Sequence, residues 1–192
     1  MKARFIVCAL LLTTALASLA GTATAQAKPA EKATFASVLD HQLSGVEHEL
    51  VPAAEAMPAD KYSFAPTQGE FKGVRDFGSQ IKHIASVNYM IGAAILGTPP
   101  PAAAGEGENG PANVTSKGEI VSYLKDSFVY LHKAINTINA ANILEPIKAP
   151  WGTAPTTRLS MAVIAVGHPF DHYGQLVEYL RMNGIVPPAS RS

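Results

Sequence analysis

The sequence predicts an all-α protein, an up-down four-helix bundle, and three observations support that prediction. Four long segments place apolar residues at three- and four-residue steps, which is the spacing of one helix face. No segment of convincing length alternates apolar and polar residues as a strand does, and no internal repeat is visible. Prolines and glycines gather between the four segments and mark loops. Four long helices bury such faces by packing them inward around one core.

The first predicted helix covers roughly residues 35–55. Its apolar stripe decays where Pro52 and Pro58 stand, because proline removes a backbone donor from the helix. The loop that follows contains further prolines and glycines, and we expect its aromatic residues, Tyr62 and Phe64, to be exposed.

The second predicted helix covers residues 74–96, and His83 lies on a stripe beside its main apolar face. Residues 97–115 follow, and they are rich in glycine, proline and alanine. That composition favours a mobile connection and argues against a further helix or strand.

The third predicted helix opens with a recognisable start signal. Ser116 is followed three residues later by Glu119, which is the spacing of a capping box. Apolar residues then continue at helical steps to about residue 141.

The fourth predicted helix covers residues 157–183. Gly184 suits the left-handed position just past its end, and two prolines further on prevent continuation. Pro169 lies inside this helix and lacks the N–H that would bond to the preceding turn, so we expect a kink there.

Residues 1–25 are predicted to be a cleavable export signal. Two basic residues, Lys2 and Arg4, precede an apolar run that is too short to span a bilayer comfortably. Residues 23–25, Ala-Thr-Ala, fit the small-residue rule for cleavage before Gln26. The expected location is therefore the periplasm or the outside of the cell.

The mature chain is expected to hold one domain. Residues 26–33 are polar and small and are predicted to be a flexible leader, residues 34–188 to be the bundle, and residues 189–192 to be a tail. The single cysteine, Cys8, lies in the signal, so the mature chain has no disulfide and no thiolate ligand.

Charge and hydropathy exclude two classes of partner. Removing Lys2 and Arg4 lowers the Lys+Arg count from 15 to 13 against 15 acidic residues, so the mature chain is slightly acidic. It contains no basic cluster, which nucleic-acid binding requires. No later segment is long and apolar enough for a membrane span, so no membrane partner is expected after signal cleavage.

Two of the six histidines, His168 and His172, are four residues apart in the fourth helix. On a helix this spacing points both imidazoles to one side, where they can bind one metal ion. A zinc protease would need a glutamate directly after the first histidine, and Pro169 stands there, so that activity is excluded. Taken alone, the pair also fits an ordinary surface or core role.

The remaining histidines allow several interpretations. His83 lies beside an apolar face and is either a third ligand or a hydrogen-bonded core residue. His41, His48 and His132 are expected in solvated or packing roles, although His41 or His48 also fits the border of a site. If the histidines never meet, the chain is a plain helical interaction protein.

Three stretches of the chain, in order, carry a resemblance to a known family. They are "MPADKYSFAP" at 57–66, "FGSQIKHIASVN" at 77–88 and "HYGQLVEYLRMNGIVPP" at 172–188. The chain resembles the DinB/YfiT-like family over residues 34–188, and the last stretch is the most specific.

That resemblance implies an up-down four-helix bundle in which three histidines hold one divalent metal ion. The matching positions are His83, His168 and His172. Three neutral imidazoles leave coordination positions for water or substrate, as in catalytic sites. Related families use such an ion for thiol-dependent transfers and isomerisations. The export signal departs from that cytosolic setting and puts a thiol substrate in doubt.

The expected function follows from this site. We expect an exported protein that binds one divalent cation, zinc or nickel first and iron next, and acts as a metal-dependent hydrolase or transferase on a small molecule. The alternative is a non-catalytic metal-binding or structural module of the cell envelope. Helix faces left over from the bundle also suggest a homodimer.

Overall fold

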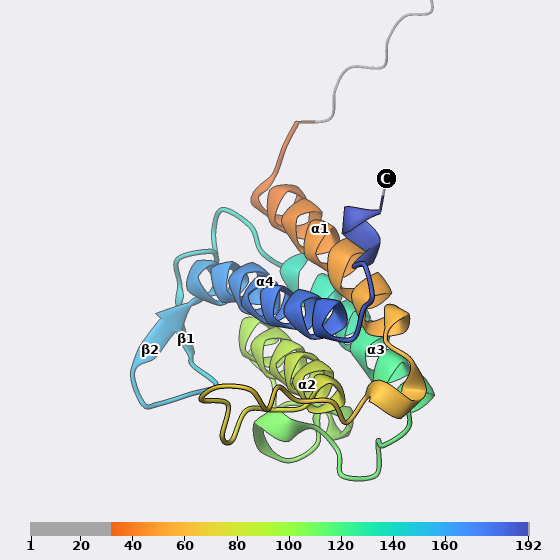
Figure 1. Cartoon of the computed structure of the whole chain (residues 1–192). Helices are drawn as coiled ribbons and strands as arrows, with labels where there is room; N and C mark the ends of the chain where they lie inside the picture. The colour runs from red at the N-terminus through yellow and green to blue at the C-terminus, as the bar shows by residue number, and fades with distance from the viewer. Residues whose placement is uncertain (1–31, 192) are drawn as a thin grey trace, which may run out of the picture. The chain divides into compact units, whose positions relative to one another are not determined.

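The computed structural model describes residues 32–191, and within that part four long helices follow one another along the chain (Figure 1). They are α1 (Phe35–Ala56), α2 (Phe77–Leu96), α3 (Lys117–Ile135) and α4 (Arg158–Met182). The all-α four-helix bundle is confirmed. The predicted export signal and most of the predicted leader lie outside the described residues. No helix in the described part is long and apolar enough to cross a membrane.

Each long helix begins at a polar side chain that accepts a backbone N–H from its first turn. These caps are Thr34, Asp76, Ser116 and Thr157. The predicted capping box at Ser116 is confirmed, because Glu119 Oε2 accepts the N–H of Ser116 at 2.8 Å. Such caps are each worth about 1 kcal/mol, so local sequence fixes where the helices start.

Proline and glycine act differently in α4. The helix continues through Pro169 without interruption, and the kink predicted at that residue stays a prediction. Gly184 has a φ of 72°, which confirms the left-handed position predicted just past the helix end.

The third helix ends at Ile135, earlier than predicted, and asparagines explain the difference. Asn139 Oδ1 accepts the N–H of Ala141, and Asn142 Oδ1 accepts the N–H of Asn139. Such local side-chain bonds compete with the helical pattern and favour turns. Ile138 remains buried in that turn, which is why the apolar period seemed to continue.

A short hairpin between α3 and α4 was not expected from the sequence. Strands β1 (Pro146–Lys148) and β2 (Pro155–Thr157) pair antiparallel, with Ile147 opposite Thr156. Three residues are too few to show an alternating pattern, so the sequence gives no signal for them. The hairpin lies at the start of α4 (Figure 1).

Helix α4 runs antiparallel to α2. Near the start of α4, Arg158 Nε donates to the carbonyl of Ile95 at the end of α2 (3.0 Å). Near the end of α4, the Tyr179 hydroxyl donates to the carbonyl of Arg75, just before α2 (3.2 Å). The start of α2 is therefore brought beside the second half of α4.

Helix α3 runs parallel to α2 and antiparallel to α1. Asn88 Nδ2 in α2 donates to Ser127 Oγ in α3 (3.1 Å), and a turn further along both helices Gly92 lies against Tyr130. Lys117 Nζ, at the start of α3, donates to the carbonyl of Glu55 at the end of α1. The helix directions along the chain are thus up, down, down, up. The four-helix bundle holds, but the strict up-down alternation expected from the sequence is wrong for α2 and α3, which run parallel.

A parallel pair of consecutive helices needs a connection that returns along their length. Residues 97–116, called here the return strap, cover this distance of about 30 Å beside α2. Ser86 Oγ donates to the carbonyl of Gly107 (2.7 Å), and the Tyr123 hydroxyl donates to that of Ala104 (3.0 Å). The strap is drawn in green next to α2 in Figure 1. The expectation of a mobile connection is wrong, because these bonds tie the strap to the helices.

The loop between α1 and α2 is also packed more closely than expected. Tyr62 is only 7% exposed, and its hydroxyl donates to the carbonyl of Ala54 at 2.6 Å. Phe64 is partly buried and meets the ring of Tyr179 edge-on, with 5.7 Å between ring centroids. The predicted exposure of Tyr62 is wrong, because its ring covers the end of the core while its hydroxyl finds a backbone partner.

Candidate metal centre

Three histidines from two antiparallel helices meet on one side of the bundle. His83 comes from the second turn of α2, and His168 and His172 come from α4. Their candidate ligand nitrogens all lie within 4.8 Å of one another. The ring centroids of His168 and His172 are 4.7 Å apart, and both lie about as close to His83. The cluster expected from the sequence is therefore present in the fold.

The return strap orients the first of these rings. Nδ1 of His83 lies 2.8 Å from the carbonyl oxygen of Glu108, which belongs to a 3-10 turn at Gly107–Asn109. A carbonyl oxygen only accepts, so Nδ1 of His83 carries the proton and Nε2 keeps a lone pair. Hydrogen bonds of this kind hold metal-binding histidines in the required tautomer.

Gln80 plays the corresponding part for His172. Its Oε1 lies 3.2 Å from Nδ1 of His172, and the side chain of Gln80 is almost completely buried. The amide oxygen accepts the proton on Nδ1, which leaves Nε2 of His172 as the atom able to bind. Two of the three rings are thus fixed by acceptors on their far side.

His168 completes the set, and its distance to His83 is compatible with a shared metal ion. Its Nε2 lies 3.1 Å from Nε2 of His83, while its buried Nδ1 has no hydrogen-bond partner among the described residues. Two nitrogens that each lie about 2.0–2.1 Å from one ion, at ligand angles of about 90–110°, are roughly 2.9–3.4 Å apart. The observed separation lies inside that range.

Burial keeps these histidines neutral. Burial first, and then the neighbouring His172, His83 and Arg75, together lower the pKa of His168 to about 3. Burial, His83 and Arg75 lower the pKa of His172 to about 4, against an opposing effect of Asp171. Burial also lowers the pKa of His83, although the Glu108 carbonyl opposes this. Neutral imidazole is the form that binds metal, so the three ligands are ready at neutral pH.

A cavity of about 430 Å³ lies against this cluster. His172 and Gln80 form one part of its wall, and Arg75, Asn109 and Gln175 form much of the rest. The histidine cluster therefore has a neighbouring space that can hold a small molecule.

Comparison with known proteins places the fold in a family. The family model of the DinB superfamily matches residues 42–176. The chain belongs to the DinB superfamily. Among solved structures, it is similar to a DinB-like protein from Bacillus cereus ATCC 10987, with 15% sequence identity and a TM-score of 0.60. The similarity covers 78% of this chain and 93% of that chain, and at this identity it supports the fold alone. No curated protein matches significantly.

The other histidines of this DinB superfamily member lie elsewhere. His41 and His48 are exposed on α1 and do not border the three-histidine cluster. His132 of α3 bridges to α1, with Nδ1 2.7 Å from Asp40 and Nε2 3.1 Å from Glu47. It has the packing role that the sequence suggested.

Sequence reasoning missed three parts of this DinB superfamily site. Gln80 precedes His83 by three residues on α2, and that spacing is the one signal that points to it. The Glu108 carbonyl carries no sequence signal, because any residue has one. Arg75 fell inside the predicted second helix at 74–96, but α2 begins at Phe77 after its cap Asp76, so Arg75 lies in the preceding loop.

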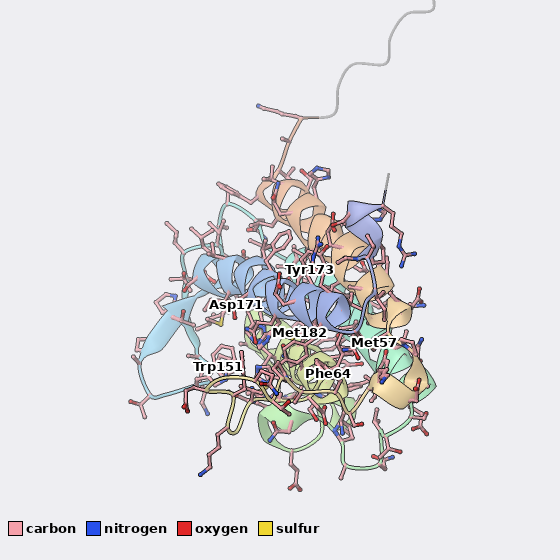
Figure 2. The ribbon with its side chains drawn as sticks, in the orientation of Figure 1. Met57, Phe64, Trp151, Asp171, Tyr173 and Met182 are labelled. Atoms are coloured by element: carbon pink, nitrogen blue, oxygen red, sulfur yellow. The ribbon has the colours of Figure 1, made fainter. Side chains whose placement is uncertain are left out.

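Two residues beside His172 in sequence have no direct part in the cluster. Asp171 is exposed and accepts from Gln175 Nε2 at 3.0 Å. Tyr173, labelled between α4 and α1 in Figure 2, donates to Glu49 Oε2 at 2.9 Å and so ties α4 to α1.

Proposed function

We propose that this DinB superfamily protein binds one divalent metal ion through His83, His168 and His172 and acts as a metal-dependent hydrolase or transferase on a small molecule. One observation carries the proposal. Nε2 of His83 and Nε2 of His168 face each other at 3.1 Å, and the proton of His83 is held on its opposite nitrogen by Glu108. The lone pair on Nε2 of His83 therefore points at Nε2 of His168, and a cation bound between the two nitrogens would take the place of the proton that otherwise joins them.

The residues around the cluster fix the position and the protonation state of the histidine rings. Glu108 and Gln80 hold two rings by their Nδ1 atoms, and the cavity beside His172 offers room for a substrate. A divalent ion bound there supplies Lewis acidity, which lowers the pKa of a bound water or thiol. Imidazole ligands suit zinc, nickel and iron, and we propose zinc or nickel first.

We further propose export to the periplasm or the medium, with a mature chain that starts at Gln26 and a bundle domain at 34–188. The basic start, the apolar run and the Ala-Thr-Ala sequence at 23–25 support this. Mass spectrometry of the protein recovered from a periplasmic fraction tests it, and an intact Met1 would contradict it.

A homodimer is part of the same proposal. Phe35 and Val38 are each 51% exposed, although both are apolar and lie one turn apart near the start of α1. Light scattering on residues 26–192 tests this, with Val38→Asp as the variant expected to dissociate the dimer. A monomeric wild-type protein would contradict the proposed homodimer.

The main test is elemental analysis of residues 26–192 produced without a histidine tag. We expect about one equivalent of a transition metal in the wild type and in the control His48→Ala, which changes an exposed histidine. His168→Ala is expected to lose the metal. A folded wild-type protein that takes up no added zinc or nickel would contradict the proposal.

The non-catalytic alternative makes a different prediction for the loaded protein. A catalytic ion keeps an exchangeable water, whereas a purely structural ion has a completed coordination shell. Water-proton relaxation of the manganese- or cobalt-loaded protein distinguishes the two. A shell without exchangeable water would favour the metal-binding module.

A further inference from the structure

The cavity beside His172 carries a positive charge from Arg75. Its lining contains one charged side chain, the cation Arg75, next to neutral polar side chains from Gln80, Asn109 and Gln175. No carboxylate of residues 32–191 is part of this lining. A cationic space of about 430 Å³ at the edge of a metal centre is suited to a small anion.

The charge of Arg75 is not neutralised by a carboxylate within the described residues. Arg158 pairs with Glu145 and Lys125 pairs with Glu55, but Arg75 forms no ion pair in residues 32–191. Its guanidinium contacts the neutral side-chain oxygen of Asn109 at 3.4 Å, which is a long hydrogen bond. Most of the five donors of this guanidinium are therefore available to another acceptor.

The backbone of Arg75 is held firmly. Its carbonyl accepts the hydroxyl of Tyr179, and the next residue, Asp76, caps the start of α2 by accepting the N–H of Ser79 at 2.7 Å. The Asp76 carboxylate is thus engaged with the helix end. The guanidinium projects from a fixed anchor, so little ordering is needed when it binds an acceptor.

Arg75 is also close to the metal-binding cluster. Its positive charge contributes to the lowered pKa of His83, His168 and His172 alike. His172 and Arg75 line the same cavity, so one small molecule can contact both. A guanidinium binds a carboxylate or phosphate through two parallel hydrogen bonds, which gives direction as well as affinity.

We propose that the substrate of this centre is a small molecule with an oxyanionic group, a carboxylate or a phosphate. Arg75 binds that group, with Asn109 and Gln175 beside it, and the reacting end of the molecule lies at His83, His168 and His172. This inference rests on the proposed function, because it assumes a metal centre at those histidines. It makes Arg75 a specificity-determining residue.

The test compares two thiol probes of equal length on the cobalt-loaded protein. The probes are 3-mercaptopropionate and the neutral 3-mercapto-1-propanol, and thiolate binding to cobalt gives a charge-transfer absorption band. We expect the carboxylate probe to bind about tenfold or more tightly in the wild type, as a charged hydrogen bond predicts. Substituting 2-mercaptoethyl phosphate for the carboxylate probe shows which oxyanion is preferred.

Two variants isolate the role of Arg75. Arg75→Met removes the charge and is expected to abolish the preference for the anionic probe while keeping one equivalent of cobalt. Lys72→Met removes an exposed cation from the same loop that does not line the cavity, and the preference should remain. An equal preference in wild type and Arg75→Met would overturn the inference.

The experiment distinguishes failure of the proposed metal site from failure of the proposed anion site. If the wild type takes up no cobalt, the proposed function fails, and the anion site is then measured by NMR on the metal-free protein with propionate and 1-propanol. Shifts at residues 73–76 with propionate, absent in Arg75→Met, would support the anion site alone. No shifts would overturn it as well.

Discussion

The backbone carbonyl of Glu108 and the Nδ1 atom of His83 lie 2.8 Å apart, and this contact joins the return strap to the three-histidine cluster. The strap follows α2 because α2 and α3 are parallel, and so it passes the start of α2 on its way to α3. The path of a connection thus determines which nitrogen of His83 is protonated.

Displacing the strap is expected to weaken metal binding. Gly105 has a φ of 72°, and a Cβ there would lie 2.7 Å from the backbone nitrogen of Pro111. Gly105→Ala is therefore expected to lower the free energy of unfolding by about 1–3 kcal/mol and the zinc affinity several-fold. Urea titration and chelator competition measure the two quantities.

Gly107→Ala is the matched control for that experiment. Gly107 also has a positive φ, but an added Cβ there meets no described atom within 4 Å. Gly107→Ala should lower the free energy of unfolding, but it should reduce the zinc affinity less than Gly105→Ala does. Identical affinities in the two variants would show that the strap has no role in orienting His83.

Removing the acceptor for His172 is expected to reduce metal affinity without unfolding the protein. Gln80→Leu keeps the size of the side chain and leaves Nδ1 of His172 without its partner, so zinc affinity should fall about 10–100-fold. Gln175→Leu is the control, because Gln175 bonds to the exposed Asp171 and to no histidine. The prediction is wrong if both variants keep the wild-type affinity.

The metal-free protein is expected to lose stability in mild acid. The pKa of His168 is about 3 and that of His172 about 4 in the folded state, and both are near 6.5 when unfolded. The unfolded chain therefore binds more protons below pH 6.5, and the free energy of unfolding falls as the pH drops from about 6.5 toward 4. Above pH 6.5 this contribution is complete and constant.

Urea titrations at several pH values measure this effect against a variant that lacks both groups. The double variant His168→Gln, His172→Gln should lose less stability over the same pH range, because two of the three buried histidines are gone and only the remaining titratable groups, His83 among them, respond. Parallel curves for the two proteins would mean that these histidines are not held neutral by the fold.

The core is expected to depend on the buried face of α3. Phe128 is fully buried, whereas the adjacent Val129 is 69% exposed. Phe128→Ala should lower the free energy of unfolding by about 3–5 kcal/mol, and Val129→Ala should change it by about 0.5 kcal/mol or less. Chemical denaturation tests this. Equal losses would mean that the assigned faces of α3 are wrong.

Local sequence patterns predicted most of this fold, because neighbouring residues determine where a helix starts and ends and which of its faces is apolar. The caps at Ser116 and Gly184 and the apolar periods fixed the existence and most of the bounds of the helices. The end of α3 was missed because Asn139 and Asn142 form turn bonds that compete with the helix while Ile138 keeps the apolar period.

The candidate site was predicted in part. The spacing of His168 and His172 indicated a shared face, and the family resemblance added His83, which the fold brings to them. Arg75 and the Glu108 carbonyl depend on how two loops run across the bundle, and this tertiary path leaves no period or motif in the sequence. The sequence therefore predicted the three candidate ligand residues, but not the neighbouring groups that orient them and lower their pKa.

The return strap has a consequence for how this protein tolerates genetic change. The group that holds His83 is a main-chain oxygen, so replacing the side chain at position 108 leaves that acceptor in place. Inserting or deleting a residue between Gly105 and Gly110 shifts the register and moves a different carbonyl, or none, into reach of the imidazole. In this segment, we expect length to be under stronger selection than residue identity.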